Sequence, residues 1–496
     1  MAWNILSFEL VLFVSVLTLY MKLRKGNIFS LKLVRGLITY VPPVDQDFEV
    51  LEKSNQPGRQ NKKGEVNKYD KKKLASKAKF PLRTIEIDET FLKHNQEFFI
   101  EYDFFFMLFI VVLVLFIITQ TLKFIVPQQM DGNLTFYMMM FLLLMTQVNL
   151  MKNTFNLGYF NFTDETKMEF LVAIKTFFVV LGLLKFNGSQ AFFDSNIEKA
   201  HDKSLERVNQ TLELLGGRLD LPHEFSYSLL AAFAALISFC TVRLSIRFSY
   251  YFFMLTKNRQ IVMATKKGDE LRRYKVLLYS MFVNLLSPLI VTLFYVKPLL
   301  EAFIVPEYLE ESTWRVLRVG VVVTAICMRI LTYREELQFL FNESYFLVQK
   351  LMIDKNEKIF RYIKLRIQEN FLNTWYLVFQ QTCNLIHPML LLLIYVHRLV
   401  SFITSDQSSQ RLDYASIYKR ISEEQNKAQL NGQKFEYNIF QDTASLSEMF
   451  TQISQKGLLT LEYYEAIFGF MIFWYFFSTL IVTFFSLLYY RKYVEK

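Results

Sequence analysis

Long apolar blocks dominate this sequence and limit what it can fold into. The blocks run for about 18–28 residues with few charges, and a helix rising ~1.5 Å per residue needs about 20 residues to cross ~30 Å of hydrocarbon. Hydrophobic residues make up 52% of the 496, and the mean hydropathy is +0.21. A soluble chain of this length would instead spread its apolar residues in short periodic runs. The blocks exclude an ordinary soluble, a disordered or a disulfide-rich secreted protein.

We predict an all-α fold, a polytopic transmembrane bundle of about nine helical spans. Backbone exposed to lipid must form its own hydrogen bonds, and the alternating pattern of barrel strands is absent. The expected spans lie near residues 4–21, 103–126, 134–151, 168–186, 225–255, 276–299, 314–333, 371–402 and 463–490.

The distribution of Lys and Arg predicts the orientation. Basic residues follow the first span, fill the connection 256–275 and end the chain, whereas the connections 127–133 and 300–313 contain none. Because cytoplasmic loops carry the excess of Lys and Arg, we expect the N-terminus outside or in the lumen and the C-terminus in the cytoplasm. The first span then acts as an uncleaved anchor. The net charge of +10 is a topology signal and requires no nucleic acid as a partner.

Four segments follow from these spans. Residues 1–102 hold the first span, an amphipathic helix expected over 28–40 on the inner membrane surface, and a basic linker. Residues 103–402 hold the main bundle, 403–462 a polar and partly disordered outside loop, and 463–496 the last span and tail. Glycosylation acceptors on expected outside connections are Asn133, Asn187 and Asn209.

Charges inside spans are the main functional candidates, because such residues face the bundle interior or water. Five charged residues lie near span ends, where they can reach the interface: Glu9, Glu169, Arg247, Lys297 and Arg315. Arg318 and Arg329 are about three turns apart on nearly one helix face. This spacing suits a field-sensing or anion-coordinating helix or, more simply, ion pairs with carboxylates such as Glu9 or Asp103. The charged candidates are Lys175, Arg243, Arg318, Arg329 and Arg334.

Prolines within or at the end of spans are the second set of candidates. Pro288, Pro298 and Pro388 each free a backbone carbonyl four residues earlier, which can hinge a helix or line a cavity. His387 and His397 share one span but lie on different helix faces, so they do not suit one metal site. The 3 Cys lie inside spans without metal-type spacing. We therefore expect no metal site, no cofactor and no disulfide.

An ordered set of motifs runs along the chain, namely Tyr40 to Pro43 with the acidic run after it, Leu286-Ser287-Pro288, Thr313 to Arg318, and Tyr333-Arg334-Glu335-Glu336-Leu337-Gln338. This set resembles the transmembrane protein 161 family of eukaryotic multi-pass proteins. The resemblance covers most of the chain. It implies a membrane protein involved in ion currents, excitability and stress responses, with Lys175, Arg318, Arg329 and Arg334 as positions of a family-wide role.

Three functions remain open. The leading hypothesis is a non-enzymatic multi-pass protein of the plasma membrane or endomembrane system, which modulates ion homeostasis or serves as an accessory subunit of another membrane complex. An alternative is an ion channel or transporter that uses Lys175, Arg318 and Arg329 with the broken spans. A weaker alternative is a lipid-modifying enzyme that uses His387 or His397. The expected partners are the lipid bilayer and other membrane proteins.

Overall fold

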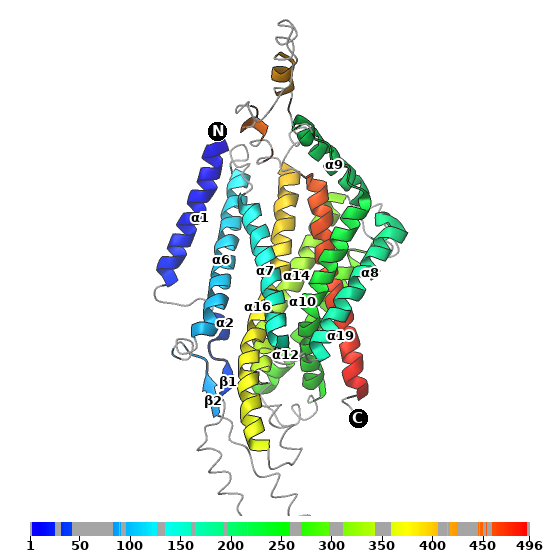
Figure 1. The fold of residues 1–496 in the computed structure, drawn as a ribbon. Helices are drawn as coiled ribbons and strands as arrows, with labels where there is room; N and C mark the ends of the chain where they lie inside the picture. Colours follow the sequence, from blue (N-terminus) through cyan, green and yellow to red (C-terminus); the bar gives the residue numbers. More distant parts are fainter. Residues whose placement is uncertain are drawn as a thin grey trace, which may run out of the picture. The chain divides into compact units, whose positions relative to one another are not determined.

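Long α-helices account for most of the regular structure in the computed structural model of the chain (Figure 1). The structure describes residues 2–24, 31–41, 83–88, 90, 96–125, 134–159, 164–192, 197–215, 217–257, 269–296, 311–342, 359–404, 414, 417–423, 445, 447–449, 453 and 459–493. Its elements are α1 (Ala2–Arg24), α2 (Leu31–Val34), β1 (Ile38–Val41), β2 (Arg83–Glu86), α6 (Gln96–Ile125), α7 (Leu134–Tyr159), α8 (Asp164–Phe192), α9 (Ile197–Leu214), α10 (His223–Lys257), α12 (Asp269–Leu293), α14 (Glu311–Phe341), α16 (Ile359–Thr404) and α19 (Leu461–Tyr493).

Among the described residues, 7 helices are long and apolar enough to cross a membrane. They confirm a polytopic helical protein. Two of the predicted spans are not in this set. The described apolar stretch of α1 is shorter, Leu10–Lys22, and α8 carries Lys167, Glu169, Lys175 and Lys185. The qualifying segments are Tyr102–Leu122, Leu134–Lys152, His223–Lys257, Tyr274–Leu293, Thr313–Phe341, Thr374–Val400 and Leu461–Lys492.

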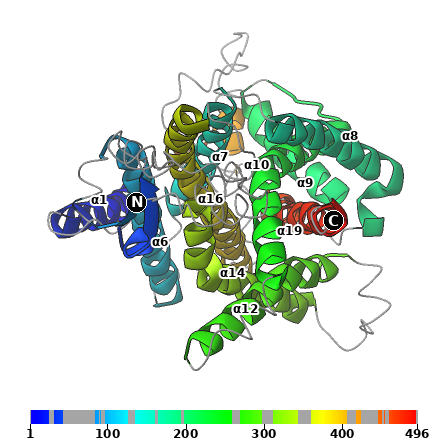
Figure 2. The same ribbon diagram turned by 90° about the horizontal axis from the view of Figure 1, so that it is seen from below.

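The described helices belong to two compact units, and the first comprises Met1–Gly26, Phe105–Thr332 and Thr382–Lys496. Within it, α10 packs against α8 and α19, as both ribbon views show (Figures 1 and 2). Small residues such as Ala231 and Ala234 are fully buried and let the helices approach closely. Hydroxyl groups add hydrogen bonds across the α10–α19 interface, where Trp474 donates to Ser238 over 2.9 Å. The core of this unit is therefore partly polar.

The second unit comprises Asn27–Phe104 and Tyr333–Gln381, two segments that the sequence placed in different domains. It contains a two-stranded antiparallel sheet, β1–β2, with Thr39 opposite Ile85. The amphipathic helix predicted over 28–40 is therefore wrong in its second half, where residues 38–41 form a strand in an otherwise helical fold. Gly36, with φ 78°, ends the short helix α2, and β-branched residues then favour a strand.

Side chains of α14 hold this hairpin in place. The carboxamide of Gln338 donates to the Ile38 carbonyl over 3.0 Å and accepts from the Ile38 N–H over 2.9 Å. Arg334 donates to the Arg35 carbonyl over 3.3 Å. The Gln338 carboxamide thus forms the pair of hydrogen bonds that a neighbouring strand would form with Ile38 on the free edge of β1.

A small apolar cluster lies beyond the bundle, at the C-terminal end of α9. Leu214 packs there against Tyr414, Ile417 and Met449, which come from the segment predicted as a polar loop. Burial raises the pKa of the Tyr414 phenol, which shares a 3.0 Å hydrogen bond with Thr211. Parts of this loop are therefore ordered against α9.

Candidate functional site

A buried ion pair joins α8 and α10. Arg243 Nε lies 2.8 Å from Glu169 Oε1, and Nη2 donates to Glu169 Oε2 over 3.0 Å. The same Nη2 also donates to the Thr166 hydroxyl over 2.9 Å. The side chains are 3% and 0% exposed, so the two charges neutralise each other away from solvent and lipid. Glu169 lies near the predicted end of its span, where we expect it to reach the interface, but its side chain is buried in the bundle.

The break at Pro388 in α16 carries a second polar group. Proline leaves the Asn384 carbonyl without its helical donor, and the Tyr475 hydroxyl from α19 donates to that carbonyl over 2.8 Å. Arg329 of α14 in turn donates to the Tyr475 oxygen, and its guanidinium carbon lies 5.1 Å from the centre of the Tyr475 ring. Three helices thus meet where the backbone of α16 is interrupted.

The break at Pro288 in α12 is satisfied within its own helix. The Ser287 hydroxyl donates over 3.1 Å to the Asn284 carbonyl, which Pro288 leaves without its helical donor. The Asn284 side chain donates to Thr332 of α14 over 3.0 Å. At both described helix breaks, a protein hydroxyl group therefore donates to the carbonyl that the proline leaves without its helical donor.

Each histidine of α16 is bound by a glutamine from another helix. His387 contacts Gln147 of α7, whose carboxamide oxygen accepts from the Cys240 thiol over 3.6 Å. His397 lies 2.5 Å from Gln120 of α6. In this arrangement the carboxamide nitrogens donate and the imidazole nitrogens that face them accept. The two histidines are about ten residues apart on separate faces, as their sequence spacing predicts.

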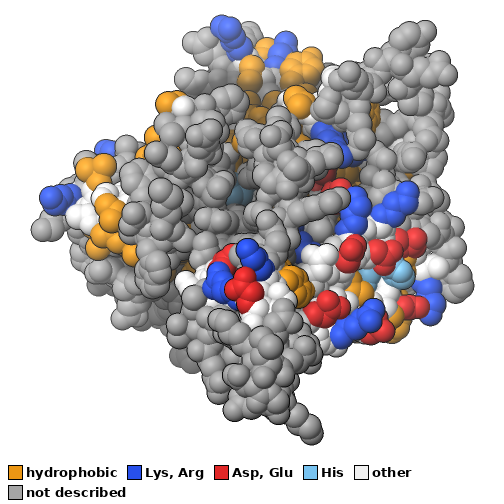
Figure 3. Space-filling view, turned by 90° about the horizontal axis from the view of Figure 1, so that it is seen from above, with side chains coloured by type: hydrophobic (Ala, Val, Ile, Leu, Met, Phe, Trp, Pro, Cys, Tyr) orange, Lys and Arg blue, Asp and Glu red, His pale blue; other side chains and the backbone are white. Residues whose placement is uncertain are grey.

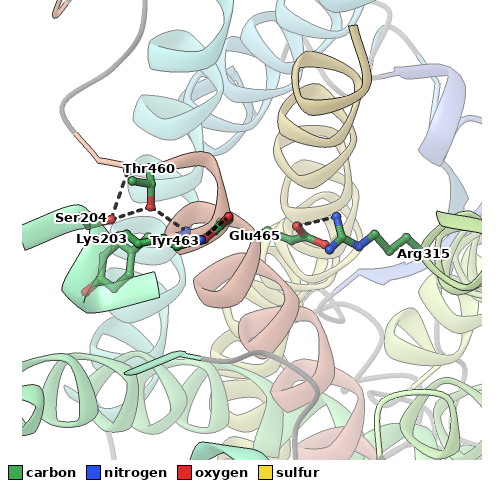
Figure 4. A network of polar contacts seen from close by, with 7 residues as sticks. Lys203, Ser204, Arg315, Thr460, Tyr463 and Glu465 are labelled. Atoms are coloured by element: carbon green, nitrogen blue, oxygen red, sulfur yellow. Dashed lines mark hydrogen bonds and ion pairs between the residues drawn. The ribbon is translucent and has the colours of Figure 1, made fainter. Parts of the chain in front are cut away.

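Arg318 lies where α12 ends. Its Nε donates to the Phe294 carbonyl over 3.1 Å, and its guanidinium carbon lies 5.4 Å from the centre of the Tyr295 ring. One turn earlier, Arg315 is 3.3 Å from Glu465 of α19 (Figure 4). Arg318 and Arg315 are therefore held by a carbonyl, aromatic rings and a carboxylate of the same unit.

Lys175 differs from these arginines. It is exposed on α8, and among the described residues it has no hydrogen bond or ion pair. Around it lie apolar side chains that are also exposed, including Ile174 at 58% and Phe178 at 65%. With 3.6 residues per turn, Lys175 falls near the middle of this apolar face, about 120° around the helix from Glu169.

The other predicted site residues lie outside these groups. Arg334 belongs to the second unit, and Asn209 on α9 accepts a 2.8 Å hydrogen bond from the Leu219 N–H. Asn187 lies within α8, which continues to Phe192, beyond the predicted end of the span. Pro298 and Asn133 lie outside the described residues.

Sequence reasoning missed several residues of these polar groups. Arg398 is 5% exposed, and its guanidinium carbon lies 3.5 Å from the centre of the Phe136 ring and 4.7 Å from that of Tyr464. Asn384 could have been found, because it stands four residues before Pro388. No local signal marks Tyr475 as its partner, since they are 91 residues apart.

A groove of about 400 Å³ lies between α12 and α14. Its lining is mostly apolar and contains Ser287, Gly320 and Thr324, but none of the arginines described above. The groove therefore suits hydrocarbon better than an ion.

A family described as "Predicted transmembrane protein 161AB" matches residues 4–495 of the chain. No curated protein matches the chain. No solved structure matches it either.

Proposed function

The chain belongs to the transmembrane protein 161AB family, and we propose that it is a non-enzymatic accessory subunit that binds another membrane protein through the exposed face of α8. The chain is an integral, multi-pass membrane protein. The partner is a transmembrane helix that places an Asp or Glu side chain opposite Lys175. The resemblance to the family implies that this complex helps to control ion currents and excitability.

The observation that carries the proposal is the exposed charge of Lys175. It lies about 16 Å along the helix axis from the start of α8 and is surrounded by exposed apolar side chains. A charge at such a position costs about 2.5–3.5 kcal/mol on insertion scales. A carboxylate from a neighbouring helix offsets this cost, as Glu169 does for Arg243 inside the bundle.

The remaining cations support an accessory role over ion transport. Arg243, Arg318 and Arg329 donate to a carboxylate, a backbone carbonyl and a phenol, respectively. A permeating ion would compete with these short contacts for the same groups. The two histidines of α16 each contact a glutamine, which favours a structural use over catalysis.

We also propose nine crossings, with the N-terminus outside and the C-terminus in the cytoplasm. This adds α1 and α8 to the seven qualifying helices. The charge of Glu169 does not oppose insertion of α8, because Arg243 neutralises it within the bundle. The packing of α8 along α10, including a 5.1 Å contact between the Phe170 and Phe239 rings, supports a helix that shares the depth of α10.

The test compares complexes of the full chain isolated in a mild detergent. We expect a stable complex with a second membrane protein for the natural chain and for Lys175→Arg, which keeps the charge. Lys175→Met should release the partner and leave the thermal stability of the isolated chain unchanged.

Lys185→Met is the matched control, because Lys185 is also exposed on α8 but lies nearer its C-terminal end. A complex that survives Lys175→Met contradicts the proposal. So does a complex that contains only copies of this chain.

A further inference from the structure

Two histidines and an aspartate meet at the end of the first unit that carries α9. His201 and Asp202 are neighbours on α9, and His223 is the first residue of α10. One possible ligand atom from each lies within 4.8 Å of the other two. His223 Nε2 is 3.5 Å from Asp202 Oδ1, and the two imidazole centres are 5.0 Å apart. The turn between α9 and α10 therefore brings His223 next to His201 and Asp202.

The position of His201 is fixed by hydrogen bonds. One ring nitrogen lies 3.0 Å from the Leu221 carbonyl, and the other lies 2.7 Å from the Ser226 hydroxyl. In metal sites, one nitrogen of a ligating histidine is usually held by a carbonyl or carboxylate while the other binds the metal. The Leu221 carbonyl accepts from the nitrogen that faces it, so the nitrogen beside Ser226 is the one available to an ion, which would take the place of its contact with the Ser226 hydroxyl.

His223 and Asp202 leave the site accessible. Their side chains are 44% and 64% exposed, whereas His201 is 5% exposed. His223 Nδ1 is a buried nitrogen without a hydrogen-bond partner among the described residues. Seen from above, histidine side chains are bordered by carboxylates on this face (Figure 3). The site thus combines one rigid ligand with two that a dissolved ion can reach.

We propose that His201, Asp202 and His223 bind a divalent transition-metal ion, with Zn²⁺ as the best fit. Two imidazole nitrogens and one carboxylate oxygen form a donor set that Zn²⁺ accepts, with a fourth position for water. Ca²⁺ and Mg²⁺ prefer sets made of oxygen alone. The exposed ligands and the fourth position make the ion exchangeable. This inference is independent of the proposed function of α8.

The bound ion acts on the start of α19. The Ser226 hydroxyl that contacts His201 lies 2.7 Å from the Tyr463 hydroxyl. Nearby, Lys203 is 2.8 Å from Glu462, and the Ser204 and Thr460 hydroxyls are 2.7 Å apart (Figure 4). Because His201 and Asp202 belong to α9 and His223 to α10, the ion joins these two helices beside their contacts with α19 and stiffens the junction. Zn²⁺ therefore raises the thermal stability of the full chain.

The experiment measures binding of Zn²⁺ to the metal-free full chain in detergent by competition with a fluorescent zinc indicator. We expect one equivalent of bound Zn²⁺ and no displacement by excess Ca²⁺. The double variant Asp202→Asn/His223→Ala should bind more than about tenfold more weakly, since even outer contacts of metal sites contribute 10–100-fold. These side chains are exposed, so the variant should fold like the natural chain.

Glu206→Gln/Asp220→Asn is the control, because it removes two carboxylates that lie within about one helical turn in sequence of the proposed ligands but none of the ligands themselves. It should keep the affinity for Zn²⁺. Co²⁺ provides a second readout, because nitrogen and oxygen ligands give it a visible absorption band that the Asp202/His223 variant should lack. Equal affinity of the natural chain and this variant, or displacement of Zn²⁺ by Ca²⁺, would overturn the proposal.

Discussion

At the scale of single residues, burial decides which charges belong to the fold. Arg243 and Glu169 are both buried and form two contacts of 2.8 and 3.0 Å. Removing either partner would therefore lower the free energy of unfolding substantially. Lys203 and Glu462 are also 2.8 Å apart, but their side chains are 58% and 44% exposed. Water screens the second pair and not the first. The same distance therefore corresponds to different contributions to stability.

This difference predicts the effect of neutralising each acid. Glu169→Gln leaves Arg243 as a buried, uncompensated charge and should lower the free energy of unfolding by about 3–5 kcal/mol. Glu462→Gln should cost less than about 1 kcal/mol. Adding Arg243→Met to Glu169→Gln should restore much of the loss, because it removes the unpaired charge. Equal losses for the two single variants, measured by denaturant unfolding in micelles, would show that the buried pair is not structural.

At the scale of elements, proline breaks organise the polar contacts between helices. Pro288 and Pro388 each leave a carbonyl that a hydroxyl then satisfies, Ser287 in α12 and Tyr475 for α16. The α16 break needs a donor from another helix, so it fixes α16 against α19. Arg329 extends the contact to α14. These breaks therefore join helices and do not by themselves indicate a pore.

A double-mutant cycle tests the role of Tyr475. Tyr475→Phe should lower the free energy of unfolding by about 1–3 kcal/mol, because the Asn384 carbonyl becomes buried and unsatisfied. Pro388→Ala supplies a backbone N–H that can reach the same carbonyl. In that background Tyr475→Phe should cost clearly less. If the two changes are additive in thermal unfolding, Tyr475 does not compensate for the proline.

The elements also show what the sequence can predict. Apolar blocks, intramembrane basic residues and helix-breaking prolines are local signals that can be recognised in the sequence. The β1–β2 hairpin could not be predicted in this way, because Gln338 binds its free edge from a position 300 residues away in the chain. His201 and His223 form no motif, since only the turn between α9 and α10 brings them together. The motifs that suggested the family include Tyr40 and Gln338, and the structure joins their segments in one unit.

At the scale of the whole molecule, the topology can be tested with inserted epitopes. Nine crossings place the connection 217–222 outside, and the C-terminus and the residues between α7 and α8 in the cytoplasm. An epitope at 217–222 should be accessible to antibody on intact cells or from the lumen. An epitope at 160–163 should be detected only when antibody can reach the cytoplasmic side of the membrane. The N-terminus should share the side of 217–222. Detection of 160–163 and 217–222 on the same side would show that α8 does not cross.

The central claim is that the exposed face of α8 binds another membrane protein through Lys175. The most direct measurement is photo-crosslinking in native membranes from position 178, whose phenylalanine is 65% exposed, and from position 184, whose leucine is 4% exposed. We predict a protein adduct from 178 that is lost in Lys175→Met and kept in Lys175→Arg. Position 184 should crosslink only within the chain. If 178 reacts with lipid alone, or if its protein adduct persists in Lys175→Met, the claim is contradicted.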